Sequence, residues 1–237
     1  MFLRSQTLLR NQTLLLCRNF LPDEPCLYKI QTYYLDWNGT LLDDAWLCVE
    51  ILNRMLACRG MKTTSIFEYQ KYFDFPVINY YIKLGFNFEK ESFDDVAKEY
   101  IRAYESQCRE CHLRQGVIDV VKQFKAKGFL QSVLSASQQS SLLGILEFFG
   151  LKEFFENVAG LDDYYAHSKV DIGRKLLKNL AISGREILLI GDTTHDYEVA
   201  CQIGSDCLLL PAGHQSRERL VACGAKVCDS FDEAFKS

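Results

Sequence analysis

Short apolar segments with the character of β-strands alternate with segments of helical spacing through the second half of the 237-residue chain. Strand-like segments occupy residues 130–134, 158–160, 186–190, 207–210 and the vicinity of 227. Helical patterns occupy residues 117–127, 141–149, 170–180, 196–203 and 217–222. This alternation predicts β-α-β crossovers and a parallel sheet that is covered by helices on both faces.

The first half of the chain has a different pattern. Residues 30–35 form one more apolar strand-like segment, and residues 44–113 show helical spacing with no strand pattern of their own. The predicted fold class is therefore α/β, a doubly wound parallel sheet core with an inserted all-helical cap. We assign residues 28–43 and 114–237 to the core and 44–113 to the cap, and leave 1–27 as an N-terminal extension of unknown role.

Bulk properties exclude several classes of protein. A formal net charge of -4 argues against a nucleic-acid-binding protein, which normally carries a basic face. No apolar run approaches the roughly 18–20 residues that a membrane span needs, so we expect a soluble protein with no membrane partner. The ten cysteines are interpreted as reduced thiols of an intracellular protein.

The N-terminal 22 residues contain Arg4, Arg10 and Arg18 and no acidic residue. This composition is compatible with a mitochondrial presequence. It is also compatible with a helix that packs on the core, which we favour, or with a start codon placed too far upstream. We expect a cytoplasmic protein, with a mitochondrial location as the alternative.

Polar and charged residues follow several of the strand-like segments. Asp36 comes directly after the strand at 30–35, Ser135 after the strand at 130–134, and Asp192 shortly after the strand at 186–190. Lys169 opens the helix that ends near residue 180, and Asp196 lies four residues beyond Asp192. The carboxyl ends of parallel strands share one edge of a sheet, so these side chains are expected to face one crevice.

This set of residue types has a chemical logic. A carboxylate can attack phosphorus and split a difficult hydrolysis into two easier steps. It approaches a phosphate dianion only where a lysine and a divalent cation neutralise the charge. Carboxylate oxygens suit Mg²⁺, which we predict as the cofactor.

The four segments, in this order, resemble the four motifs of the haloacid dehalogenase superfamily, and the helical insert resembles the cap of its phosphoglycolate-phosphatase-like branch. The resemblance runs from about residue 30 to the C-terminus and implies a Rossmann-like core. It implies that Asp36 is the nucleophile and a metal ligand, that the backbone carbonyl of Asn38 is a second ligand, and that Asp192 and Asp196 complete the Mg²⁺ site. Ser135 and Lys169 are then catalytic.

The same resemblance implies contacts to the substrate from Ser135, Ala136, Lys169 and Thr40. The implied reaction is Mg²⁺-dependent hydrolysis of a small phosphomonoester through an aspartyl phosphate, by a monomer or homodimer whose partner is a small phosphorylated metabolite. The sequence names no substrate.

Position 38 departs from the family pattern. Phosphatases of the superfamily usually carry an aspartate two residues after the nucleophile, as acid for the leaving group and base for water; here it is Asn38. An amide cannot exchange a proton at useful pH, so a contribution of about 10²- to 10⁴-fold should be largely absent. The protein then hydrolyses esters with good leaving groups or recruits another base, passes the phosphoryl group to another acceptor, or binds phosphorylated ligands without turnover.

Three histidines and three cap lysines are secondary candidates. We interpret His167, His195 and His214 as structural or substrate-facing, although the loop 211–216 that carries His214 could approach the site. A cap lysine among Lys62, Lys71 and Lys83 would be needed for carbon–phosphorus bond cleavage, which some relatives with a changed position 38 perform.

Overall fold

The computed structural model describes residues 30–161 and 169–235, and its core is a parallel sheet of six strands in the order β5-β4-β1-β6-β7-β8. In chain order the strands are β1 (Thr32–Leu35), β4 (Leu130–Gln138), β5 (Asn157–Leu161), β6 (Ile187–Gly191), β7 (Asp206–Leu209) and β8 (Lys226–Val227). β1 lies at the centre, and the later strands are added on both sides of it. The prediction of a doubly wound α/β core is confirmed.

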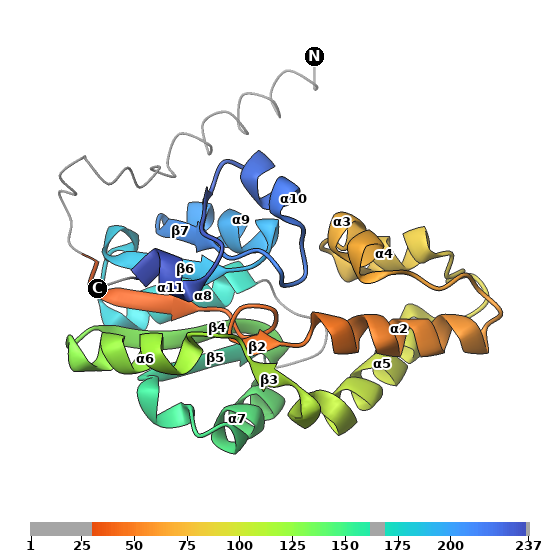
Figure 1. The fold of residues 1–237 in the computed structure, drawn as a ribbon, viewed down its shortest axis with the longest axis horizontal. Helices are drawn as coiled ribbons and strands as arrows, with labels where there is room; N and C mark the ends of the chain where they lie inside the picture. The colour runs from red at the N-terminus through yellow and green to blue at the C-terminus, as the bar shows by residue number, and fades with distance from the viewer. Residues whose placement is uncertain (1–29, 162–168, 236–237) are drawn as a thin grey trace, which may run out of the picture.

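Helices cover both faces of the sheet (Figure 1). One layer contains α6 (Val117–Ala126), α7 (Gln139–Phe148) and α11 (Phe231–Phe235), and the other contains α8 (Lys169–Leu180), α9 (Thr194–Ile203) and α10 (Arg217–Ala222). Short 3₁₀ turns are η2 (Lys152–Phe154) and η3 (Gly184–Glu186). Because side chains of a strand alternate in direction, Tyr33 of β1 packs with the first layer and Tyr34 with the second.

The four helices between residues 45 and 107 form the body beside the core that Figure 1 draws in orange to yellow-green. They are α2 (Ala45–Cys58), α3 (Ile66–Tyr72), α4 (Val77–Leu84) and α5 (Phe93–Gln107), followed by the turn η1 (Cys108–Glu110). Ser65 and Ser92 begin α3 and α5 by accepting the N–H of the third helical residue. Gly85 ends α4 in the left-handed conformation, as glycine does at helix ends.

The prediction of an insert without strands was wrong in one detail. β2 (Leu42–Asp43) pairs antiparallel with β3 (His112–Leu113), so the two chain segments that enter and leave the helical body are joined to each other. A strand of two residues is too short to show the alternation from which strands are recognised in sequence.

Two further findings concern the sequence predictions. Within the described residues, none of the helices combines the length and the apolar composition that a membrane span requires. Seven cysteines there are free thiols, but Cys201 forms a disulfide, which corrects the expectation that all the thiols are reduced. The extension 1–27 and His167 lie outside the described residues.

Candidate active site

Asp36 and Asp192 lie side by side because their strands do. β1 ends at Leu35 and pairs with β6, which ends at Gly191, and the backbone N–H of Asp36 donates to the carbonyl of Ile190 at 2.9 Å. Both carboxylates therefore lie beyond the carboxyl ends of adjacent central strands, where open α/β sheets place their ligand sites. The two side chains predicted to share a crevice are brought together.

Lys169 connects two carboxylates at this edge. Its Nζ lies 2.7 Å from Oδ1 of Asp36 and 2.5 Å from Oδ1 of Asp196, and all three side chains are buried. Burial alone would lower the pKa of Lys169, but the charges of Asp196 and Asp36 outweigh it and raise that pKa. Lys169 is therefore a permanent cation in contact with Asp36.

Asp36, Asp192 and Asp196 form a buried cluster in which each offers one carboxylate oxygen within 4.8 Å of the others. Burial raises the pKa of Asp36 to about 7 and that of Asp192 to about 6, although Lys169 and His214 act in the opposite direction. For Asp196 the charge of Lys169 outweighs burial and lowers the pKa. Buried carboxyl groups that lie this close together ionise less readily without a counter-charge. A hard divalent cation such as Mg²⁺ supplies that charge and prefers oxygen ligands.

Asp192 is fixed by two loops. Its Oδ1 accepts the hydroxyl of Thr40 at 3.1 Å, and its Oδ2 accepts the backbone N–H of His214 at 2.5 Å. The approach depends on glycine: a Cβ on Gly39, whose φ is +70°, would lie 2.2 Å from Oδ2 of Asp192, and one on Gly213 would lie 2.1 Å from it. The glycines let the two loops close against the carboxylate.

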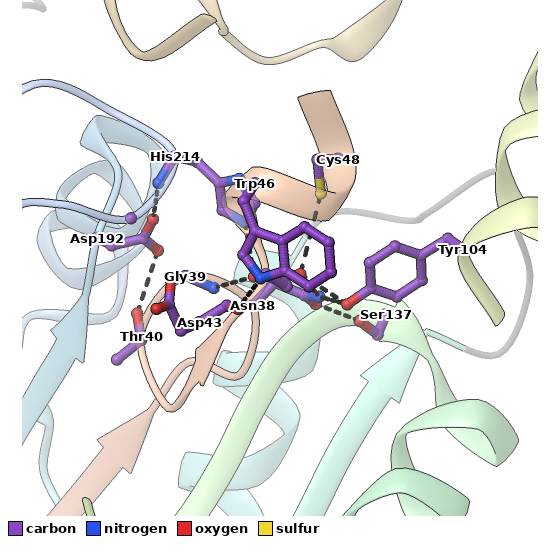
Figure 2. Close-up of polar contacts among 12 residues, drawn as sticks. Asn38, Gly39, Thr40, Asp43, Trp46, Cys48, Tyr104, Ser137, Asp192 and His214 are labelled. Carbon is purple, nitrogen blue, oxygen red and sulfur yellow. Dashed lines mark hydrogen bonds and ion pairs between the residues drawn. The ribbon is translucent and has the colours of Figure 1, made fainter. Parts of the chain in front are cut away.

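Asn38 is the centre of a hydrogen-bond network, which Figure 2 shows. Its Nδ2 donates to Oδ2 of Asp44 at 2.7 Å and to the hydroxyl of Tyr104 at 2.6 Å. Its Oδ1 accepts the hydroxyl of Ser137 at 2.6 Å. The side chain thus joins the loop after β1 to α5 and to the end of β4.

Asp44 precedes α2 but does not cap it, since its side chain makes no capping hydrogen bond. Its carboxylate instead accepts from the N–H of Gly39 at 2.8 Å, from Asn38, and from the hydroxyl of Tyr104 at 2.6 Å. Burial would raise the pKa of Asp44, but His214 and these donors lower it. Asp44 is a buried carboxylate directly beside position 38.

His214 forms an ion pair with this carboxylate. Its Nε2 lies 3.4 Å from Oδ1 of Asp44, and its Nδ1 lies 2.8 Å from the hydroxyl of Tyr69 on α3. Burial would lower the pKa of His214, but Asp44 and Asp192 outweigh it and raise that pKa to about 9. Asp44, His214 and Cys48 also offer potential metal-ligand atoms within 4.8 Å of one another. The ion pair between Asp44 and His214 explains why these two side chains lie together. The hypothesis that the loop 211–216 approaches the site is borne out by these contacts.

Arg114, which directly follows β3, ties two loops of the site together. Its guanidinium donates to the carbonyls of Gly39 and Pro211, each at 2.7 Å. α3 is held to the same region, because Gln70 donates to the carbonyl of Gly213 at 2.9 Å and accepts the N–H of Ser216 at 3.0 Å. The helical body is therefore closed on the core in this structure.

The remaining predicted residues are placed as follows. Ser135 is buried, and its hydroxyl accepts the N–H of Ser137 at 3.1 Å, whereas Ala136 is exposed. Asp196 lies in the first turn of α9, where Thr193 is the N-cap and Asp196 closes a capping box with it. The ring of His195 contacts that of Phe75, with centroids 4.8 Å apart.

The cap lysines do not enter the site. Lys62, Lys71 and Lys83 are exposed, and Lys83 lies over the ring of Tyr72 with its Nζ 3.9 Å from the ring centroid. A buried lysine that could form a Schiff base is thus absent from these three positions.

Comparison with known proteins agrees with the fold and with the order of these segments. The family model described as haloacid dehalogenase-like hydrolase matches residues 34–210, which include Asp36, Lys169, Asp192 and Asp196. The chain belongs to the haloacid dehalogenase-like hydrolases. The resemblance drawn from the sequence is therefore confirmed at the level of the family.

Individual relatives are distant. IndB of Dickeya dadantii, named a probable phosphatase, is 28% identical over 150 residues, 59% of this chain and 65% of IndB. The pyrophosphatase PpaX of Halalkalibacterium halodurans is 28% identical over 83 residues, 35% of this chain and 39% of PpaX. The chain thus matches less than two thirds of either relative's length.

Solved structures share the fold. CbbY of Rhodobacter sphaeroides, in complex with phosphate, has a TM-score of 0.68 at 20% identity, over 86% of this chain and 96% of CbbY. A haloacid dehalogenase-like family hydrolase of Streptococcus pneumoniae has a TM-score of 0.72 at 17% identity, over 85% of this chain and 94% of that one.

Proposed function

We propose that this protein is a Mg²⁺-dependent phosphatase of small phosphorylated metabolites that works through a phosphorylated Asp36. The observation that carries the proposal is the buried lysine between two carboxylates: Lys169 lies 2.7 Å from Asp36 and 2.5 Å from Asp196. A nucleophilic carboxylate must be held and its charge balanced before an anionic phosphate can approach.

Each residue of the site has its own role in this reaction. Asp36 attacks phosphorus as the bond from phosphorus to the leaving oxygen breaks, and becomes an acyl phosphate; water then hydrolyses the acyl phosphate, which releases phosphate and restores the carboxylate. Lys169 orients Asp36 and stabilises the negative charge on the transferring group. Asp36, Asp192 and Asp196 would hold Mg²⁺, together with the carbonyl of Asn38, and the cation supplies charge neutralisation for the phosphoryl oxygens. Ser135 and the N–H groups near Ala136 would bind those oxygens.

The similar proteins support the substrate class. Of the two relatives, one is named a probable phosphatase and the other a pyrophosphatase. CbbY has been solved with phosphate and, in a mutant form, with xylulose-1,5-bisphosphate. A small phosphorylated compound is the ligand that this chain's buried lysine and carboxylates would bind in the same crevice.

The test is phosphate release from a panel of phosphorylated metabolites, with Mg²⁺ and with a chelator. We expect turnover that requires Mg²⁺ and that disappears in Asp36→Asn. The matched control is Asp43→Asn, which removes an exposed acid from the nearby strand β2 and should leave turnover unchanged. Turnover by Asp36→Asn at the wild-type rate refutes the assignment of the nucleophile. Folded wild type that binds phosphorylated ligands without turning them over supports a binding protein instead.

A further inference from the structure

The side chain of Asn38 has no hydrogen left to give to a substrate. Both hydrogens of its amide are used, one on Asp44 at 2.7 Å and one on the hydroxyl of Tyr104 at 2.6 Å. Its oxygen already accepts the hydroxyl of Ser137 at 2.6 Å. An amide also cannot release a proton at physiological pH, so position 38 offers a departing oxygen neither a proton nor a hydrogen bond.

The neighbours of Asn38 use their own protons within the same network. The hydroxyl of Tyr104 donates to Asp44 at 2.6 Å, and that carboxylate is fully buried. The two ring nitrogens of His214 face Asp44 at 3.4 Å and Tyr69 at 2.8 Å. The polar groups around position 38 are thus paired with one another.

Acceptance of an alkyl phosphate depends on such a proton. When Asp36 forms its bond to phosphorus, the bond from phosphorus to the leaving oxygen breaks, and that oxygen takes the electron pair. An alkoxide that leaves unprotonated is a much stronger base than a phenolate, because the alcohol from which it derives is about as weak an acid as bulk water. A phenolate corresponds to a pKa of about 10, and a phosphate to about 6.

We infer that this site is specific for phosphoryl compounds whose leaving group departs as a stable anion, that is, aryl phosphates, acyl phosphates or phosphoanhydrides, and that it discriminates against alkyl phosphates. The inference rests on the proposed function, since it concerns the leaving group of the same phosphoryl transfer to Asp36. The hydrogen-bonded network of Asn38, Asp44 and Tyr104 then sets the substrate class.

Besides His214, the described chain contains His112, which is exposed on β3, and His195, which we consider as a source of a proton. Its side chain is 22% exposed, its Nδ1 lies 3.4 Å from Glu198, and its ring contacts Phe75. These contacts join it to Glu198 on α9 and to Phe75 of the cap. We therefore expect His195→Gln to leave the dependence on the leaving group unchanged.

The wild-type enzyme provides the first test. We would measure kcat/KM for a series of substituted phenyl phosphates, acetyl phosphate, pyrophosphate and glycerol phosphate, since kcat/KM reports the transfer to Asp36. We expect it to rise steeply with the acidity of the leaving group and to be at least about 10²-fold lower for glycerol phosphate than for nitrophenyl phosphate. Equal values across the series overturn the inference, and so does a further fall of kcat/KM for glycerol phosphate, without a fall for nitrophenyl phosphate, in His195→Gln.

The exchange variant Asn38→Asp/Asp44→Asn provides the second test, because it keeps one acid and one amide at the same two positions. We expect this variant to raise kcat/KM for glycerol phosphate by about 10²-fold and to change kcat/KM for nitrophenyl phosphate little. If it does not fold, the wild-type series decides alone. Failure of the proposed function has a separate signature: no reagent, including acetyl phosphate, then phosphorylates Asp36, and the inference falls with it.

Discussion

Asn38→Asp should destabilise the metal-free protein in a pH-dependent manner, because it replaces a hydrogen-bond donor with a second carboxylate. The amide nitrogen lies 2.7 Å from Oδ2 of Asp44, and that carboxylate is fully buried. Two unit charges at this distance repel by about 6 kcal/mol at an effective dielectric constant of about 20. Protonating one of the two acids costs less. The cost is about 1.4 kcal/mol for each pH unit above the ordinary aspartate pKa of about 3.9, which gives about 4 kcal/mol at pH 7.

The sign of the pH dependence follows from linkage. The folded variant holds a proton that the unfolded chain has released, so its stability falls as pH rises and recovers as pH falls. Relative to wild type, the loss should shrink from at most about 4 kcal/mol at pH 7 to about 1.5 kcal/mol at pH 5. Asp36 and Asp192 titrate in both proteins, so their contribution cancels in the difference.

The assay is urea unfolding of both proteins with a chelator present, at several pH values between about 5 and 7. Asn38→Asp/Asp44→Asn is the matched control, because it contains a single carboxylate at the pair and should lose this additional dependence on pH. A loss of stability in Asn38→Asp that stays constant across this range, or that is below about 1 kcal/mol at pH 7, refutes the contact between positions 38 and 44.

Three further predictions concern Lys169, the metal ligands and Gly213. Lys169→Met should reduce turnover by at least about 10²- to 10³-fold in steady-state assays, since Asp36 and Asp196 lose their shared cation, and an active variant contradicts this role. Mg²⁺ affinity should fall as pH drops from about 7.5 to 5.5, because the raised pKa values of Asp36 and Asp192 make protons compete with the metal. Calorimetry in buffers of different ionisation enthalpy should detect the release of protons on Mg²⁺ binding, and an affinity that stays constant with pH contradicts the raised pKa values. Gly213→Ala should weaken activation by Mg²⁺, because its Cβ would lie 2.1 Å from Asp192, whereas Gly144→Ala, with nothing within 4 Å, should not.

The core and its site edge could be predicted from sequence because they follow from local patterns. The strand at 187–191 is a continuous apolar segment, and its position fixes where Asp192 emerges. The same holds for Asp36 after β1 and for Lys169 at the start of α8. Helix α11 was missed, since five residues show too little periodicity to be recognised.

The network around Asn38 could not be predicted, because its members are distant in sequence and ordinary in local context. Tyr104 lies 66 residues beyond Asn38 and fits the regular spacing of a cap helix. Asp43 and Asp44 both look like residues that begin α2, and no local signal tells which one turns inward. Ser137 follows the predicted end of its strand, and its role appears only because β4 continues to Gln138.

The most direct test of the central claim is detection of phosphorylated Asp36. Wild-type enzyme would be mixed with Mg²⁺ and acetyl phosphate, quenched in acid within the first turnovers, digested and analysed by mass spectrometry. We expect one phosphoryl group on the peptide that contains Asp36, and none in the Asp36→Asn variant. Turnover without a labelled Asp36, or a label on another residue that survives in Asp36→Asn, would contradict the account.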